Sequence, residues 1–407
     1  MRELKLAGSF TLTVIMLLTQ SSGVGHVRAL AKRDSPLQTK KYFTFSPVEA
    51  AVPIAPTSVE NGGKMHLVYE LHITNFTSSD LTLTTAEVLS GASPIASYKG
   101  EELYSRLLHV GVSGDLPDKG IIGGGMRVVL YIWLTVDNVA VPSILRHQFT
   151  FKAPKLVGSD EERHVEGAQI EVRKEKPVVI TPPFRSGTWA AGNGPSNTSI
   201  HRRNLNRVDG KVRISQRFAF DWFKLGDKAK GEDEGKLVHD DPYKNENWYD
   251  YGTEVLAVAD GVVSGVKDGI PENVPLSGKR VVPITLETIA GNYVFLDLGH
   301  DRFALYAHLQ PGIRVKVGDR VRRGRVLGLL GNSGNSDSPH LHFHIVNGNS
   351  PLGAEGLPFV LESYEVLGVL SDLGVLTRDN GWMPRPGATI EERRKEMPLE
   401  NMIIRVP

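Results

Sequence analysis

The chain has 407 residues, and its 47 Lys and Arg residues almost balance its 46 Asp and Glu residues, for a formal net charge of +1. This balance excludes the strongly basic class of nucleic-acid-binding proteins, and we expect no nucleic-acid partner. Cysteine is absent, which excludes disulfides, thiolate metal sites and a cysteine nucleophile, so any metal ion must be bound by His and carboxylate side chains.

The N-terminal segment combines a charged start with a short apolar run. Residues 6–18 carry no charge, and a polar stretch then leads to Ala29. This pattern predicts a secretory signal peptide over residues 1–29, with an uncleaved membrane anchor as the alternative. The run of 13 residues is shorter than the about 20 that span a bilayer. We therefore expect a secreted, periplasmic or cell-envelope protein with no stable membrane span after signal cleavage.

Residues 40–176 alternate apolar and polar side chains in short runs that are separated by turn-forming residues. The clearest runs are residues 66–73, 81–88, 128–134 and 148–151. A period of two predicts half-buried strands, and several such strands predict a β-sandwich-like accessory domain. His66 and His72 share a strand face, but no third ligand type lies nearby, so we expect surface or edge histidines. The domain could bind cell wall, dock a protein partner or be autoinhibitory, and its residues do not decide between these roles.

The remainder of the chain divides into a connection, a second domain and a tail. Residues 177–197 are rich in Pro, Gly and Ser, which predicts a linker. Residues 198–360 are predicted to form an antiparallel β domain, and residues 361–407 a C-terminal extension. The strands that we expect in this domain lie within residues 255–263, 292–297, 303–308, 315–321 and 326–330. With 42 Gly and 24 Pro, the chain as a whole is predicted to be mainly β.

Three histidines alternate with apolar residues near the end of this domain, at His340, His342 and His344. On a strand, residues two apart point to the same face, so the three imidazoles project together while the residues between them enter the core. A zinc ion would be bound by some of these imidazoles and a carboxylate, with one position left open for water. The alternative is a polar strand that faces solvent.

The surrounding motifs resemble those of the lysostaphin/LytM-type zinc endopeptidases. Residues 306–309 read Tyr-Ala-His-Leu, residues 331–336 form a Gly-rich turn, and residues 339–343 read Pro-His-Leu-His-Phe. Their order and spacing fit this family over about residues 219–345. The resemblance implies a LytM-type antiparallel β catalytic domain that binds Zn²⁺.

The resemblance also implies roles for individual residues. His342 corresponds to a zinc ligand and Asp221 to the carboxylate ligand. His308 and His340 correspond to the two catalytic histidines beside the metal. His344 stands where relatives often carry another polar residue.

The sequence departs from the family pattern at Arg217, where a metal-binding His is expected four residues before Asp221. Arginine is always cationic and does not bind zinc. Either His201 supplies the missing imidazole, or the site is degenerate and binds no metal. Residues 204–216, with Asp-Gly at their centre, predict a hairpin that returns His201 to the neighbourhood of Asp221. His239 is a weaker substitute.

Together these observations predict a secreted zinc metalloendopeptidase. The resemblance implies that it hydrolyses peptide bonds in bacterial peptidoglycan cross-links or stem peptides. The main alternative is a catalytically degenerate LytM-like domain that binds cell wall or activates a partner hydrolase. A lipoyl- or biotinyl-like carrier domain at residues 315–324 is a further alternative, but the segment has no Met-Lys-Met-like turn with a lysine at its tip, which is the residue that such a carrier modifies.

Overall fold

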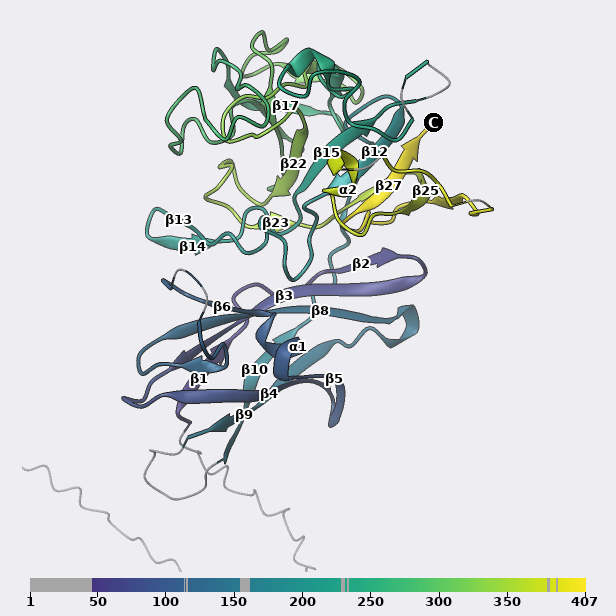
Figure 1. Cartoon of the computed structure of the whole chain (residues 1–407). Coiled ribbons are helices and arrows are strands. Elements are labelled where there is room, and N and C mark those ends of the chain that lie inside the picture. The colour runs from purple at the N-terminus through teal and green to yellow at the C-terminus, as the bar shows by residue number, and fades with distance from the viewer. Residues whose placement is uncertain are drawn as a thin grey trace, which may run out of the picture. The chain divides into compact units, whose positions relative to one another are not determined.

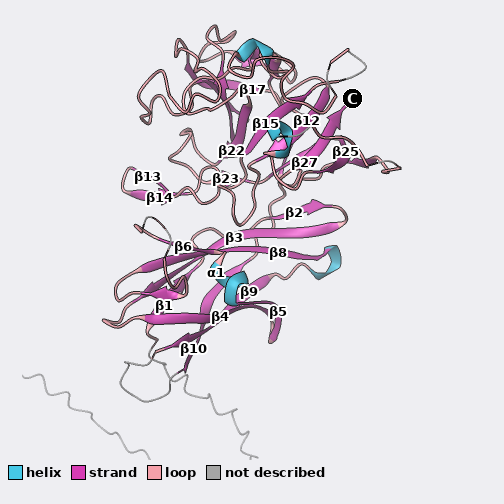
Figure 2. Cartoon of the chain, viewed as in Figure 1, coloured by secondary structure: helices cyan, strands magenta, loops and turns pink. Residues whose placement is uncertain are grey.

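The computed structural model describes residues 46–112, 114, 116–153, 162–227, 231–232, 234–378, 381–385 and 387–407. The predicted signal peptide, residues 1–29, lies outside these described residues. Strands dominate the described part of the chain (Figure 2), which confirms the predicted mainly β class. Within the described residues, we find no helix with the length and apolar character needed to cross a membrane.

The N-terminal part of the chain forms two five-stranded antiparallel sheets. The first sheet consists of β1 (Val48–Ala51), β2 (Ser58–Asn61), β3 (Lys64–Asn75), β6 (Leu107–His109) and β8 (Arg127–Asp137). The second consists of β4 (Leu81–Ser90), β5 (Ser93–Lys99), β7 (Ile121–Ile122), β9 (Ile144–Lys152) and β10 (Glu162–Glu171). The short helices α1 (Gly100–Tyr104) and η1 (Asn138–Ala140) connect strands. Both sheets contribute to one apolar core, which is compatible with a sandwich.

Strand β3 is buried on both of its faces. Leu67, Tyr69 and Leu71 pack into the core that the two N-terminal sheets share. Val68, on the opposite face, belongs to the core of the C-terminal sheet. His66 is also buried, and Trp133 Nε1 donates a hydrogen bond to its Nδ1 at 3.1 Å. The expectation that His66 is a surface or edge residue is therefore wrong, because β3 is covered on the face where His66 lies.

An 11-stranded sheet organises the C-terminal part, with the strand order β20-β17-β18-β19-β22-β15-β12-β27-β25-β26 and β23 paired to β22. Figure 1 shows β22, β15, β12 and β27 in this order. Their bounds are β12 (Gly187–Gly192), β15 (Phe220–Leu225), β17 (Gly261–Lys267), β18 (Asn292–Asp297), β19 (Phe303–Leu309), β20 (Arg320–Val321), β22 (Leu341–Val346), β23 (Gly356–Leu357), β25 (Tyr364–Val369), β26 (Glu391–Arg393) and β27 (Met402–Val406).

Smaller elements complete this part of the chain. They are the parallel pair β11 (Val178–Ile180) and β24 (Phe359–Leu361), the hairpin β13 (Asn206–Val208) and β14 (Lys211–Arg213), the pair β16 (Glu254–Leu256) and β21 (Val326–Leu329), and the helices η3 (Asn245–Asn247) and α2 (Val375–Arg378). The β13–β14 hairpin confirms the one predicted from residues 204–216.

Residues 177–197, predicted as a linker, contain two strands of the C-terminal part. Strand β12 lies between β15 and β27, and Trp189 and Ala191 on it are fully buried. The predicted extension, residues 361–407, supplies β25, β26 and β27 to the same sheet. Composition alone concealed β12, because its short apolar run stands among Gly and Pro residues.

Candidate metal centre

Two neighbouring strands place a carboxylate and an imidazole side by side. In the antiparallel pair β15–β22, Asp221 stands directly opposite His342. Their neighbours Phe220 and Phe343 also pair, and both are fully buried on the other face. Residues that face each other across a strand pair share a sheet face, so core packing of the phenylalanines directs Asp221 and His342 together. His342 Nδ1 lies 2.9 Å from Asp221 Oδ1.

His201 reaches the same place from a turn that precedes the β13–β14 hairpin. Asp209 and Gly210 both adopt positive φ angles, of 50° and 71°, as a tight two-residue hairpin turn requires. The chain thus reverses and returns towards β15. His201 Nε2 lies 3.5 Å from Asp221 Oδ2, and one potential ligand atom from each of His201, Asp221 and His342 lies within 4.8 Å of the others. The structure therefore brings the three predicted metal ligands together.

A backbone carbonyl determines which nitrogen of His201 is free. His201 Nδ1 lies 2.9 Å from Asn193 O, and a carbonyl oxygen only accepts hydrogen bonds, so Nδ1 carries the proton. Burial lowers the pKa of His201 to about 4, so its imidazole is neutral at pH 7. Nε2 is then left with a lone pair that faces Asp221. Histidine ligands commonly donate their other N–H to a carbonyl in this way.

A hydrogen-bond chain determines the free nitrogen of His342. His344 Nε2 donates to Pro351 O at 3.2 Å, and burial keeps the pKa of His344 well below its usual value, so its Nδ1 is an acceptor. His342 Nε2, 2.9 Å from that Nδ1, donates to it. His342 Nδ1, on the other side of the ring, faces Asp221 Oδ1. His344, which belongs to no predicted ligand set, thus selects the nitrogen that His342 presents.

The donor set fits a divalent cation. Burial would raise the pKa of Asp221, but the adjacent imidazoles outweigh burial and hold it well below its usual value, so the carboxylate is ionised. One nitrogen of each imidazole and the carboxylate then lie close enough together to bind a single ion. Two His and one Asp are ligand types that zinc prefers, and they leave further positions open. These three residues could hold Zn²⁺, and their metal role stays a prediction.

His308 and His340 stand at the edge of this group. His308 Nδ1 donates to Ser333 O at 2.8 Å, and His340 Nδ1 donates to Ser338 O at 2.9 Å, which leaves Nε2 of each ring without a proton when the ring is neutral. The ring centroids are 4.9 Å apart. Burial holds the pKa of His308 well below its usual value, whereas Asp221 outweighs burial and raises the pKa of His340.

All five predicted site residues line one cavity of about 410 Å³. Sequence reasoning missed three other residues that line it. Asn193 donates from Nδ2 to Asp221 Oδ2 at 2.7 Å, Phe223 stacks on His340 with ring centroids 5.3 Å apart, and the Gln216 side-chain amide lies 3.3 Å from His342 Nε2. Asn193 gave no signal, because it lies in the segment predicted as a linker.

Arg217, which replaces the expected family ligand, points elsewhere. Its guanidinium group is buried and pairs with Glu70 and Glu355. His239 is exposed and packs against Tyr249, with ring centroids 5.5 Å apart. Neither residue belongs to the group of three potential ligands.

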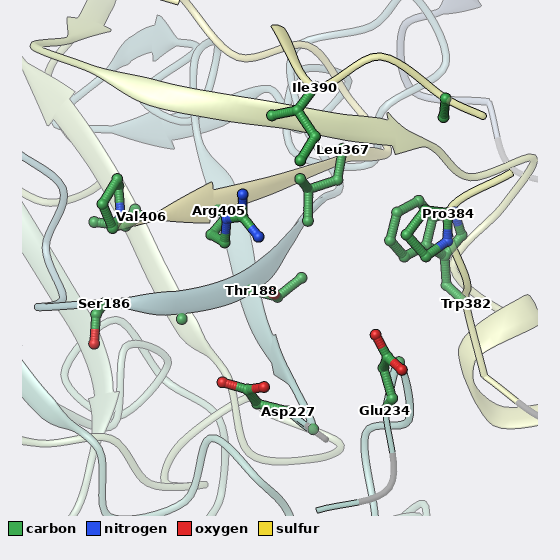
Figure 3. Close-up of a pocket in the computed structure, with 15 residues that line it drawn as sticks. Ser186, Thr188, Asp227, Glu234, Leu367, Trp382, Pro384, Ile390, Arg405 and Val406 are labelled. Carbon is green, nitrogen blue, oxygen red and sulfur yellow. The ribbon is translucent and has the colours of Figure 1, made fainter. Parts of the chain in front are cut away.

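A second cavity, of about 470 Å³, lies along β12, β25 and β27. Figure 3 shows Thr188, Leu367 and Arg405 from these strands, with Glu234 and Trp382 also lining the space. None of the described residues that line it is a histidine. This cavity therefore offers no imidazole for the chemistry considered above.

Residues 248–353 match the model of peptidase family M23. This part of the chain resembles an M23 peptidase domain. The predicted resemblance to the LytM-type family is thereby confirmed. The match begins after Asp221, so the segment that contains Arg217 and His201 lies outside it.

The curated relatives match only part of this chain. The peptidoglycan DD-endopeptidase ShyA of Vibrio cholerae serotype O1 is 37% identical over 94 residues, which are 22% of this chain and 22% of ShyA. Lysostaphin of Staphylococcus simulans is 36% identical over 121 residues, 28% of this chain and 24% of lysostaphin. The chain thus spans about a quarter or less of the length of these relatives.

The solved structures that match this chain include the catalytic domain of lysostaphin from Staphylococcus simulans. That structure is 20% identical and covers 42% of this chain and 88% of its own chain, with a TM-score of 0.22. A zinc-containing peptidase from Vibrio cholerae is 16% identical and covers 69% of this chain and 77% of its own, with a TM-score of 0.21.

Proposed function

We propose that the protein is a secreted or cell-envelope zinc metalloendopeptidase that cleaves peptide cross-links or stem peptides of bacterial peptidoglycan. The observation that carries the proposal is the convergence of His201, Asp221 and His342 beside the two further imidazoles of His308 and His340. The relative ShyA is named a peptidoglycan DD-endopeptidase, which supports a cell-wall substrate. The signal peptide predicted over residues 1–29 supports secretion.

Zinc, when bound, supplies Lewis acidity that activates water and polarises a carbonyl group. The residues of the chain perform the remaining tasks. His308 and His340 line the cavity with Nδ1 of each ring bound to a backbone carbonyl, so Nε2 of one neutral ring can accept a proton from the attacking water. The other ring, once protonated, can donate a hydrogen bond to the developing oxyanion or a proton to the leaving amine. Asn193 holds Asp221 in place through its 2.7 Å hydrogen bond.

The direct test is digestion of purified peptidoglycan followed by mass spectrometry of the released peptides. The wild-type protein should release fragments with newly formed amino termini, and a chelator or the His342→Ala substitution should abolish this release. The exposed His239 provides the matched control, because His239→Ala removes an imidazole outside the site. Absence of new amino termini with the zinc-loaded wild type would refute the proposal.

The replacement of the expected metal-binding His by Arg217 supports a second candidate function. In this alternative the domain is catalytically degenerate and binds cell wall or activates a partner hydrolase. This alternative requires no metal. It predicts that the protein sediments with peptidoglycan without cleaving it, and that His342→Ala sediments equally well.

A further inference from the structure

Strand β3 carries a buried carboxylate on the face that points away from the sandwich core. Tyr69 and Leu71 pack in that core, and strand alternation turns Val68 and Glu70 to the opposite face. Val68 there joins the core of the C-terminal sheet. Glu70 is only 2% exposed, and a carboxylate buried this deeply requires compensating partners.

Two arginines from the segment that leads to Asp221 bind Glu70. Arg202 Nε donates to Glu70 Oε1 at 2.7 Å, and Arg217 Nε donates to Glu70 Oε2 at 2.8 Å. Burial would raise the pKa of Glu70, but Arg217 and Arg202 outweigh burial and lower it. Arg217 Nη2 also donates to Glu355 Oε2 at 3.0 Å. Two buried guanidinium groups are thus balanced by two carboxylates.

Arg202 anchors the turn that carries His201. Its side chain is fully buried, and its Nη2 donates to the carbonyl oxygens of Tyr69 at 2.8 Å and Ile132 at 2.9 Å. Its Nη1 donates to Asn197 Oδ1 at 2.8 Å. These bonds tie the turn to β3 and β8. Because Arg202 directly follows His201, a displaced guanidinium group displaces the backbone that presents the imidazole.

His201 depends on such an anchor more than a ligand on a strand would. In the family pattern the corresponding His lies four residues before the Asp, whereas His201 lies 20 residues before Asp221. Strand β15 begins at Phe220 and therefore does not position His201. The hydrogen bond from His201 Nδ1 to Asn193 O orients the ring, and Arg202 fixes the backbone.

We propose that Glu70 is a positioning residue for His201, so that the N-terminal domain determines the metal affinity of a site whose ligands all lie in the C-terminal part. The inference rests on the proposed function, from which it takes the metal role of His201. Outer residues that orient metal ligands commonly change metal affinity by about 10- to 100-fold when they are replaced. Glu70 lies 131 residues before His201 in the chain and does not itself face the metal ligands.

The test measures the zinc dissociation constant of the full chain by competition with a chromophoric chelator. We expect Glu70→Gln, which keeps the shape but removes the charge, to weaken zinc binding by roughly 10- to 100-fold. Arg202→Lys keeps the positive charge but loses the planar guanidinium group with its several N–H donors, and it should also weaken zinc binding. Phe149→Leu, in the sandwich core, is the matched control for a general loss of stability. Circular dichroism of each metal-free variant verifies folding.

A double-mutant cycle separates positioning from stability, because Glu70 can affect the metal through His201 only while His201 is present. In a His201→Ala background, where Asp221 and His342 alone bind zinc more weakly and the dissociation constant is measured at higher zinc concentrations, Glu70→Gln should cause no further loss of zinc affinity. Equal losses in both backgrounds, a loss in Phe149→Leu as large as in Glu70→Gln, or unchanged affinity in folded Glu70→Gln would each overturn the inference alone. A wild-type protein that binds no zinc would overturn the proposed function together with it.

Discussion

Substituting Arg217 by histidine restores the residue that the LytM pattern expects, yet we predict a loss of stability and no gain of metal binding. Arg217 makes charged hydrogen bonds of 2.8 Å to Glu70 and 3.0 Å to Glu355, and all three side chains are buried. Removing one partner of a buried ion pair costs about 3–5 kcal/mol, because a charge remains without compensation. Arg202 still pairs with Glu70, which favours the lower end of this range.

Urea denaturation monitored by tryptophan fluorescence measures this cost, since Trp189 and Trp222 are fully buried. Arg323→His is the matched control. The Arg323–Glu362 pair is exposed on both sides, so its loss should cost at most about 1 kcal/mol. Arg217→His should also fail to restore zinc to the His201→Ala variant, because side chains at position 217 point to Glu70 and Glu355. Unchanged stability of Arg217→His, or full zinc binding by the double variant, would refute this reasoning.

Three further predictions follow from the same contacts. His344→Phe removes the acceptor for His342 Nε2–H, so zinc should bind roughly 10- to 100-fold more weakly in a chelator competition; equal affinity would show that His344 does not select the binding nitrogen of His342. The pKa of Glu70 is lower in the folded protein than its usual 4.5, so its contribution to the free energy of unfolding is complete above about pH 4.5 and is lost as the pH falls towards the folded-state pKa. Urea midpoints between pH 3 and pH 6 should therefore fall less steeply for Glu70→Gln than for wild type, and parallel curves would contradict the assignment. Zinc at about 100 times its dissociation constant should stabilise the fold by about 2.7 kcal/mol, so a chelator should lower the wild-type melting temperature while leaving that of His342→Ala unchanged.

Local patterns were sufficient to predict the elements that carry most of the site. Alternation placed His340, His342 and His344 together, and Asp-Gly at positions 209–210 predicted the hairpin that the structure contains. The pairing of Asp221 with His342 joins residues 121 positions apart. Motif resemblance suggested this pairing, because no local pattern specifies such a register.

The residues that position the site from outside the predicted ligand set could not be predicted from the sequence. Glu70 occupies a polar position of an alternating strand, which is typical of a solvent-facing residue, whereas the structure buries it against Arg202 and Arg217 of the C-terminal part. The sequence shows Arg217 only as an arginine in the place of an expected metal-binding His. The structure shows that it forms ion pairs with Glu70 and Glu355. Asn193 belongs to a Gly- and Pro-rich stretch whose composition conceals strand β12. Each of these contacts joins residues distant in the chain, where periodicity carries no information.

The metal content of purified wild type, His201→Ala and His239→Ala, measured by elemental analysis, tests the central claim most directly. The account predicts nearly one equivalent of zinc in the wild type and in His239→Ala, and its loss in His201→Ala. Full zinc in His201→Ala, or no zinc in the wild type, would contradict it.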